Sequence, residues 1–222
     1  MIINVENKQG RRAVFATLLL IILAVLIGTN ASFPGQMDES IRSFMADIQT
    51  NYGDAIMSAA TFLGSPLMSL LYAIILAIVL LLANLRLPAL WVILTAFGGV
   101  VVTQIVKVIV HRERPIGHLL SDTGSSFPSQ HVAAIWVTIF IMFLLVTPNI
   151  NSAVLRIVAK WLMITLALMT MLSRMYFSAH FFSDTIAGFL LAYAWVILCA
   201  SLYPAIATYL KNHFWIFKDQ EA

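Results

Sequence analysis

A chain of 222 residues in which 61% are hydrophobic and only 10% are charged has too few polar side chains to cover a water-soluble domain, so it indicates a membrane protein with several spans. The single cysteine excludes an intramolecular disulfide framework and a cysteine-based metal site. The net charge of +3 does not indicate nucleic-acid binding, because the basic residues form no stripe with aromatic residues between them. No repeat or Gly/Ser-rich linker divides the chain, so we expect one domain over residues 1–222.

The first apolar run, from Ala13 to about Ile27, follows a polar segment that ends in Lys8, Arg11 and Arg12. A cleaved signal peptide has the same arrangement, and the small and polar residues 29–31 would suit a cleavage site. We expect a retained first span instead, because the later spans then pair evenly.

The next segment, from Phe33 to about Ser65, is more polar than its neighbours. Apolar residues recur in it at helical spacing, which predicts an amphipathic helix lying in the membrane interface. A lid over a functional site is the alternative. The residues in this pattern are Met37, Ile41, Phe44, Met45 and Ile48.

Five further apolar runs approach or exceed the roughly 20 residues that a bilayer core requires. They cover about Leu67 to Ala83, Leu87 to Val110, Ser129 to Val146, the region of Arg156 to Arg174, and His180 to Leu210. With the first run they predict an all-α, polytopic protein with six transmembrane helices and an interfacial amphipathic helix between spans one and two.

The distribution of basic residues predicts the orientation. With both termini in the cytoplasm, eight of the 13 Lys and Arg residues lie inside and five lie outside, as the positive-inside rule favours. The polar clusters at the span ends would then share the external face of the plasma membrane. The five outer residues are Arg42, Lys107, Arg112, Arg114 and Arg174.

Lys107 and Arg114 are seven residues apart, which on a continuous helix brings both cations to within roughly 20° of one another. Pro115 then marks the end of that helix. Two cations at a span end can bind a phosphate group, although Lys and Arg in this position can also reach for lipid head groups. We expect Arg112 and Glu113 to point elsewhere and to be solvated, and we assign no role to the loop residues His111 and His118.

Two more polar stretches point to the same kind of ligand. Ser129 is placed to cap span four, whose free N–H groups favour a phosphate oxygen, and His131 in the first turn would face that anion and hold a proton. His180 and Asp184 are four residues apart, so the carboxylate can orient the imidazole and leave its other nitrogen basic. Arg174 can add a third cation. A plain helix cap and a structural ion pair are the alternatives.

These stretches resemble the signature K-x6-RP, PSGH and SR-x5-H-x3-D of the type 2 phosphatidic acid phosphatase superfamily, through Lys107 with Arg114-Pro115, Pro128-Ser129 with His131, and Ser173-Arg174 with His180 and Asp184. The resemblance implies a lipid phosphatase that uses no metal or other cofactor. It implies that His180 is the nucleophile that forms a phosphohistidine, that Asp184 orients it and that His131 protonates the leaving group. The phosphoryl oxygens would be bound by Lys107, Arg114, Ser129 and Arg174.

Gln130 departs from the signature, which usually has Gly at this position. A glycine there would allow a close backbone approach or a positive φ. We expect Gln130 to take ordinary helical geometry, so that its amide becomes an additional donor to the substrate.

A site at a span end suits a phosphomonoester or diphosphate carried on a lipid. Candidate substrates are undecaprenyl diphosphate, phosphatidylglycerol phosphate and phosphatidic acid. Transfer of the phosphoryl group to a second lipid is the alternative chemistry, and a non-catalytic lipid or anion transporter is the alternative of another class.

Overall fold

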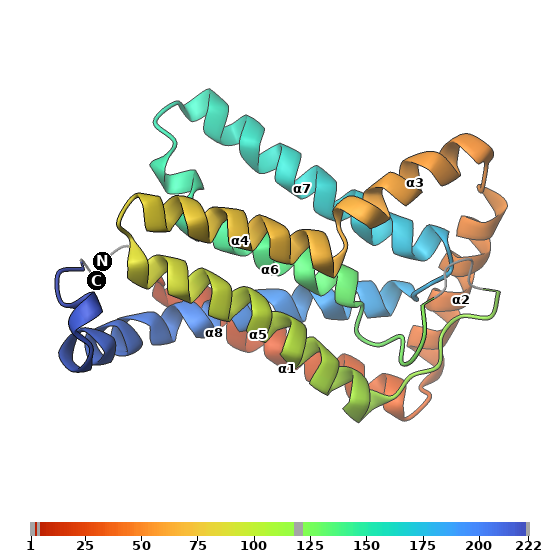
Figure 1. Ribbon diagram of the computed structural model, residues 1–222. Helices are drawn as coiled ribbons and strands as arrows, with labels where there is room; N and C mark the ends of the chain where they lie inside the picture. Colours follow the sequence, from red (N-terminus) through yellow and green to blue (C-terminus); the bar gives the residue numbers. More distant parts are fainter. Residues whose placement is uncertain (1–2, 4, 118–121, 221–222) are drawn as a thin grey trace.

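The computed structural model describes residues 3, 5–117 and 122–220, so His118 lies outside the described residues. Within these ranges the secondary structure is helical and contains no strand, which confirms the all-α prediction (Figure 1). The α-helices are α1 (Asn7–Gly28), α2 (Ser32–Asp47), α3 (Asn51–Leu63), α4 (Pro66–Leu82), α5 (Arg86–Val110), α6 (Gln130–Leu145), α7 (Ala153–Tyr176) and α8 (Phe182–His213). Short 3-10 helices cover Thr147–Asn149 and Trp215–Phe217.

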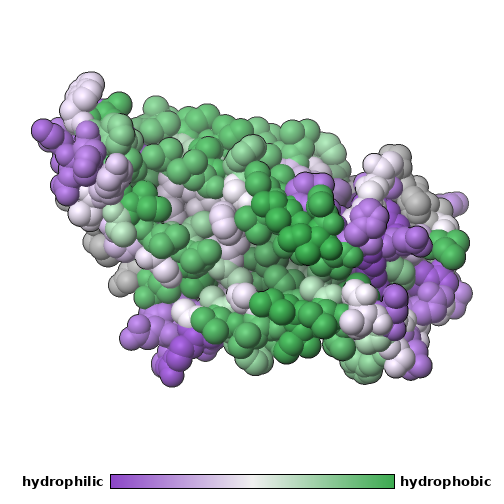
Figure 2. Space-filling model, turned by 90° about the horizontal axis from the view of Figure 1, so that it is seen from below, coloured by the Kyte–Doolittle hydropathy of each residue, from purple (hydrophilic) through white to green (hydrophobic). Residues whose placement is uncertain are grey.

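Five helical segments among the described residues are long and apolar enough to cross a membrane: α1, α5, α7, α8, and α6 with the 3-10 helix that follows it. Helices α3 and α4 are bent by 47° at their junction and together make a sixth candidate span. The hydropathy of the surface agrees, because a broad apolar band separates polar patches at the two ends of the molecule (Figure 2). The six-span prediction is therefore confirmed, with a broken pair of helices as the second span.

The break between α3 and α4 has a local cause. Pro66 occupies the first turn of α4, and Ser65 caps that helix by accepting a hydrogen bond from the backbone N–H of Met68 at 3.2 Å. Gly64 is packed so closely against α7 that a Cβ atom there would lie 2.1 Å from Thr170 Oγ1. The junction is thus held against α7 at a point where a side chain would not fit.

Helix α2 lies across one end of the bundle, where it contacts α1, α7 and α8 (Figure 1). Phe33 and Phe44 are exposed, whereas Pro34 and Asp38 are buried. This agrees with the interfacial amphipathic helix predicted from the sequence. The predicted segment reached further, to Ser65, but α2 ends at Asp47 and Thr50 caps the separate helix α3.

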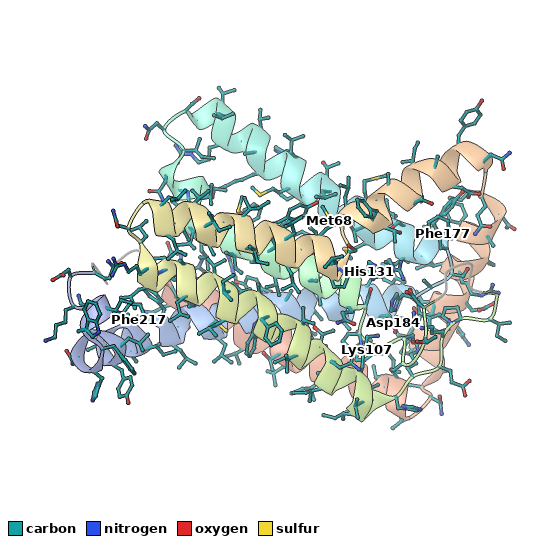
Figure 3. All side chains as sticks on the ribbon, in the orientation of Figure 1. Met68, Lys107, His131, Phe177, Asp184 and Phe217 are labelled. Carbon is teal, nitrogen blue, oxygen red and sulfur yellow. The ribbon has the colours of Figure 1, made fainter. Side chains whose placement is uncertain are left out.

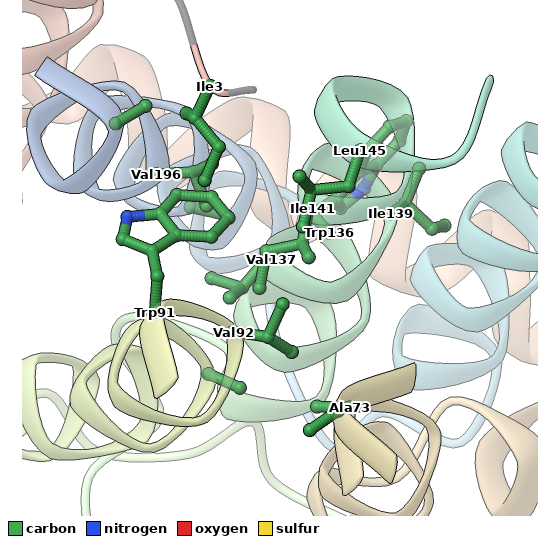
Figure 4. Close-up of a cluster of buried hydrophobic side chains, with 14 of the residues drawn as sticks. Ile3, Ala73, Trp91, Val92, Trp136, Val137, Ile139, Ile141, Leu145 and Val196 are labelled. Atoms are coloured by element: carbon green, nitrogen blue, oxygen red, sulfur yellow. The ribbon is translucent and has the colours of Figure 1, made fainter. Parts of the chain in front are cut away.

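Helix α6 is the centre of the bundle, because it packs against α4, α5, α7 and α8. Its apolar residues meet a cluster that includes Trp91 and Val92 of α5 and Val196 of α8 (Figure 4). Burial of such side chains stabilises the fold by about 1.5–3 kcal/mol each in water, whereas within lipid the same packing acts mainly through close contact. The central position of α6 fixes the direction in which its first turn points.

The first turn of α1 and the last turns of α8 lie at the same end of the bundle (Figure 1). The segment after α8 is held there by Arg86 at the start of α5, whose Nη1 donates to the carbonyl of Ile216 at 3.0 Å. Lys107, His131 and Asp184 gather near the opposite end, far from Phe217 (Figure 3). The motif residues therefore lie at the end of the bundle opposite to the first turn of α1 and the last turns of α8.

Candidate active site

Lys107 and Arg114, the two cations of the first motif, do not lie on one continuous helix. Helix α5 ends at Val110, because His111 takes a left-handed backbone conformation with φ of 47°. The prediction that Lys107 and Arg114 share one helix face is therefore wrong. Lys107 is buried in the last turn of α5, where its Nζ donates to the carbonyl of Ser125 at 2.5 Å, and Arg114 lies in the loop beyond.

Arg114 reaches the same region from that loop. Its Nη1 donates to the carbonyl of Ala179 at 2.8 Å and lies 3.4 Å from Nε2 of His180, and its Nε donates to the carbonyl of Gly124 at 3.0 Å. The two cations of the first motif thus converge through the turn that follows the helix.

The N-terminus of α6 is anchored to α8. Ser129 is the N-cap residue, as predicted, but its backbone N–H donates to the carbonyl of Asp184 at 3.0 Å, and its Oγ is buried with no hydrogen-bond partner among the described residues. The close approach requires Gly188, where a Cβ atom would lie 2.8 Å from the carbonyl oxygen of Ser129. Gln130 and His131 occupy the first turn of α6 and are half-buried, and Gln130 does not take a positive φ.

The third motif turns back on itself at the end of α7. Ser178 has φ of 50°, and the carbonyl of Arg174 accepts hydrogen bonds from the N–H groups of Ala179 at 3.0 Å and His180 at 3.2 Å. The Ala179 bond, together with the left-handed Ser178, is characteristic of the Schellman motif that commonly ends a helix. It places His180 beside the end of α7, one residue before the N-cap of α8 at Phe181, so span six begins slightly later than predicted.

His180 and Asp184 form the predicted pair. Nδ1 of His180 lies 3.6 Å from Oδ2 of Asp184, which is an ion-pair distance and longer than a hydrogen bond. Asp184 Oδ2 also accepts a hydrogen bond from the backbone N–H of Phe181 at 2.9 Å. Burial lowers the pKa of His180 to about 4; Asp184 opposes this shift, and Arg174 and Lys107 add to it. The imidazole is therefore neutral at pH 7, as a nucleophile must be.

Arg112 corrects a second expectation, because it is not solvated. Only 15% of its side chain is exposed, and it forms ion pairs of 2.7 Å with both Asp184 and Asp38. The neighbouring Glu113 is exposed, as predicted. The sequence does carry a signal for Asp38: it stands among the apolar residues that face the bundle along α2, with Ile41 three residues later. A carboxylate in such a stripe needs a cation, and Arg112 supplies it.

Asp122 is a further residue that the motifs did not indicate. Its carboxylate forms an ion pair with Arg174, which is almost completely buried, and another of 3.6 Å with Arg114. Burial alone would raise the pKa of Asp122, but Arg174 and the other nearby cations lower it below its usual value. A carboxylate thus lies between two arginines that the sequence assigned to phosphate binding.

A cavity of about 480 Å³ collects these side chains at the end of the bundle. The predicted site residues that line it are Lys107, Arg114, Gln130, His131 and His180, and Asp122 lines it with them. Such a cavity can bind a multiply charged oxyanion, with an imidazole from α6 and another from the turn before α8 facing it. Among the described residues, no group of three or more His, Cys, Asp or Glu side chains is arranged to hold a metal ion.

Comparison with known proteins gives a family match and similar folds. The family model of the PAP2 superfamily matches residues 88–207, a range that includes all three motifs. No curated protein matches the chain by sequence.

Two solved structures have similar folds. One is the transmembrane PAP2 type phosphatidylglycerolphosphate phosphatase from Bacillus subtilis, with a TM-score of 0.76 and 21% identity over 87% of this chain and 96% of that one. The other is LpxE of Aquifex aeolicus, with a TM-score of 0.55 and 18% identity over 76% of this chain and 94% of that one. At these identities the likeness concerns the fold.

Proposed function

Because the chain belongs to the PAP2 superfamily, the family that its three motifs indicated, we propose that it is a membrane lipid phosphatase acting on a phosphomonoester or diphosphate. The observation that carries the proposal is the shared cavity, in which His131 and His180 meet the cations Lys107 and Arg114. The structurally similar phosphatase from Bacillus subtilis, described as acting on phosphatidylglycerolphosphate, supports a lipid phosphate as the substrate class.

In the proposed first step, Nε2 of His180 attacks phosphorus, so that a P–N bond forms and the P–O bond to the lipid breaks. His131 donates a proton to the departing oxygen. Asp184 faces Nδ1 of His180 and holds the imidazole with Nε2 free for the attack. Lys107 and Arg114 line the cavity and neutralise the phosphoryl oxygens, which is the main demand of phosphoryl transfer, and Arg174, buried beside Asp122, adds positive charge behind them.

In the second step, His131 accepts a proton from a water molecule as the water attacks the phosphohistidine. The P–N bond breaks, inorganic phosphate leaves, and both imidazoles return to their initial states. Ser129 and Gln130 lie at the N-terminus of α6, where backbone N–H groups and the helix dipole favour an anion. The positive charge is supplied by side chains throughout, so the proposed mechanism is independent of a metal ion.

The position of the cavity supports a lipid substrate. It lies at the end of spans, so a phosphorylated head group can reach it while the acyl or prenyl tails stay beside the apolar band (Figure 2). The distribution of Lys and Arg supports the external face of the plasma membrane, with both termini in the cytoplasm.

The test is phosphate release from a panel of lipid phosphates in detergent micelles, with the purified protein and a chelator present throughout. We expect undecaprenyl diphosphate, phosphatidylglycerol phosphate or phosphatidic acid to be hydrolysed, and His180→Ala to abolish release. His213→Ala, an exposed histidine at the other end of the molecule, is the matched control and should be fully active.

Three outcomes would contradict the proposal. A requirement for a divalent ion would exclude the metal-independent mechanism. A phosphorylated acceptor lipid with little free phosphate would identify a phosphotransferase. Lipid movement across vesicles that survives His180→Ala, without phosphate release by the parent protein, would identify a transporter.

A further inference from the structure

Two charged residues that are not among the named motif residues are linked to Asp184, Arg112 directly and Asp38 through Arg112. Arg112 donates from Nη1 to Asp184 Oδ1 at 2.7 Å and from Nη2 to Asp38 Oδ2 at 2.7 Å. One guanidinium group therefore bridges a carboxylate of α8 and a carboxylate of α2. The fork of an arginine can hold two such acceptors at once in a fixed geometry.

The Arg112 side chain has little freedom to move. Its guanidinium carbon lies 4.0 Å from the centre of the Phe181 ring, a cation–π distance, and its Nη1 also donates to Ser183 Oγ at 2.8 Å. Its backbone is fixed as well, because its N–H donates to Ser125 Oγ at 3.1 Å and its carbonyl accepts from Ser126 N–H at 2.8 Å. The cation is thus held both at its head and at its backbone.

Asp38 in turn is fixed on α8. The residue is only 1% exposed, and its Oδ1 accepts from the backbone N–H of Ser183 at 2.9 Å. Its Oδ2 accepts from Ser183 Oγ at 2.5 Å as well as from Arg112. A buried carboxylate with this number of donors is held in one orientation, and so is the arginine that it binds.

The two oxygens of Asp184 have separate partners as a result. Oδ1 is bound by Arg112, and Oδ2 accepts from Phe181 N–H and faces Nδ1 of His180. The Arg112 contact therefore fixes the plane of the carboxylate relative to the imidazole. Without it, the Phe181 N–H would still hold Oδ2, but Oδ1 would lose its anchor and the plane of the carboxylate could tilt relative to the imidazole.

We propose that Arg112 and Asp38 are positioning residues for the His180–Asp184 pair: Arg112 holds Asp184 with Oδ2 toward Nδ1 of His180, and Asp38 holds Arg112. The inference rests on the proposed function, in which His180 is the nucleophile. Neither Arg112 nor Asp38 lines the cavity, so their effect is exerted on the chemical step and leaves substrate binding intact. It also makes α2 part of the site, although that helix carries none of the motifs.

The test compares Arg112→Lys and Asp38→Asn with the parent protein in steady-state phosphate release. Lysine keeps the charge but loses the fork, and asparagine keeps the shape but loses the charge. We expect kcat to fall about 10- to 100-fold in each, as for a misplaced catalytic group, with KM within about threefold. The double variant should be no slower than the worse single variant, because both act through one contact.

Arg42→Lys and Glu39→Gln are the matched controls, since this exposed ion pair lies on the same helix α2. Both should keep full activity, and melting temperatures in detergent show whether each variant is folded. If Asp38→Asn fails to fold, the kcat and KM of Arg112→Lys still test the proposal.

Several results would overturn the inference while the parent protein releases phosphate. One is a kcat within twofold of the parent value in both single variants. Another is a rise in KM that accounts for the whole loss of kcat/KM. The third is a decrease in kcat in the double variant that equals the product of the two single-variant decreases. If the parent protein itself releases no phosphate from any lipid, the proposed function fails, and this inference fails with it.

Discussion

Gly188→Ala is expected to disturb the site by moving α6 relative to α8. The added Cβ atom would lie 2.8 Å from the carbonyl oxygen of Ser129 and 3.2 Å from the backbone nitrogen of Ala133, whereas ordinary contacts begin at 3.4 Å. Both neighbours are backbone atoms, so no side chain can turn away. The start of α6 must move by roughly 0.6 Å, and overpacking of this kind costs about 1–3 kcal/mol.

The same shift acts on catalysis, because Ser129 is bonded to the carbonyl of Asp184 and His131 is two residues further along α6. A misplacement of about 1 Å can reduce a rate on the order of 100-fold, so we expect kcat to fall by about 10- to 100-fold. The assay is phosphate release together with the melting temperature in detergent.

Gly10→Ala is the matched control for this substitution. Gly10 lies in α1, and a Cβ atom there would have no neighbour within 4 Å. The control should keep full activity and gain up to about 1 kcal/mol of helix stability. Parent-like kcat and melting temperature in Gly188→Ala would refute the argument that close contact between α6 and α8 sets the geometry of the site.

Four further predictions concern three groups that line the cavity. Asp122→Asn removes the carboxylate that pairs with Arg174, so the cavity should bind the lipid phosphate more tightly and KM should fall by about 3- to 10-fold. Asp219→Asn is the control, and an unchanged or higher KM in Asp122→Asn would contradict this prediction. Because the pKa of His180 is lowered to about 4 by burial, kcat/KM should fall only as pH drops through about 4, and an acid limb near 6.5 in the pH–rate profile would contradict the assignment. The same lowered pKa means that the free energy of unfolding decreases as pH falls from 6.5 toward 4, because His180 binds a proton in the unfolded chain before it does in the folded protein. Melting temperatures measured across this pH range test this. Gln130→Gly should change the rate by less than about tenfold, because Gln130 has ordinary helical geometry, and a gain of several hundredfold would show that the backbone approach allowed by glycine matters.

The helices were predictable from the sequence because each is a long apolar run with polar ends. The start of α5 near Leu87 follows from this pattern. The convergence of His131 with His180 was also predictable in outline, since they stand at the N-terminal ends of spans four and six, which run in the same direction. The alternation of spans predicts that both histidines lie at the same end of the bundle. That they line one cavity is known only from the folded structure.

What could not be predicted depends on backbone turns and on partners distant in sequence. The left-handed conformation of His111 ends α5 early, and no local pattern required a non-glycine residue to adopt it. Arg112 forms an ion pair with Asp38, which is 74 residues away in the sequence. The burial of Arg112 therefore depends on the packing of α2 against α8. The bend before Pro66 likewise depends on contact between Gly64 and α7.

The separation of the chain ends from the cavity has a consequence for supply of the substrate. The first turn of α1 and the end of α8 lie at one end of the bundle, and the cavity lies at the other (Figure 1). In the proposed membrane orientation, a reporter fused to either terminus would therefore stand in a different aqueous compartment from the reaction. A phosphorylated lipid synthesised in the leaflet beside the termini would have to be flipped to the opposite leaflet before this protein could reach its head group.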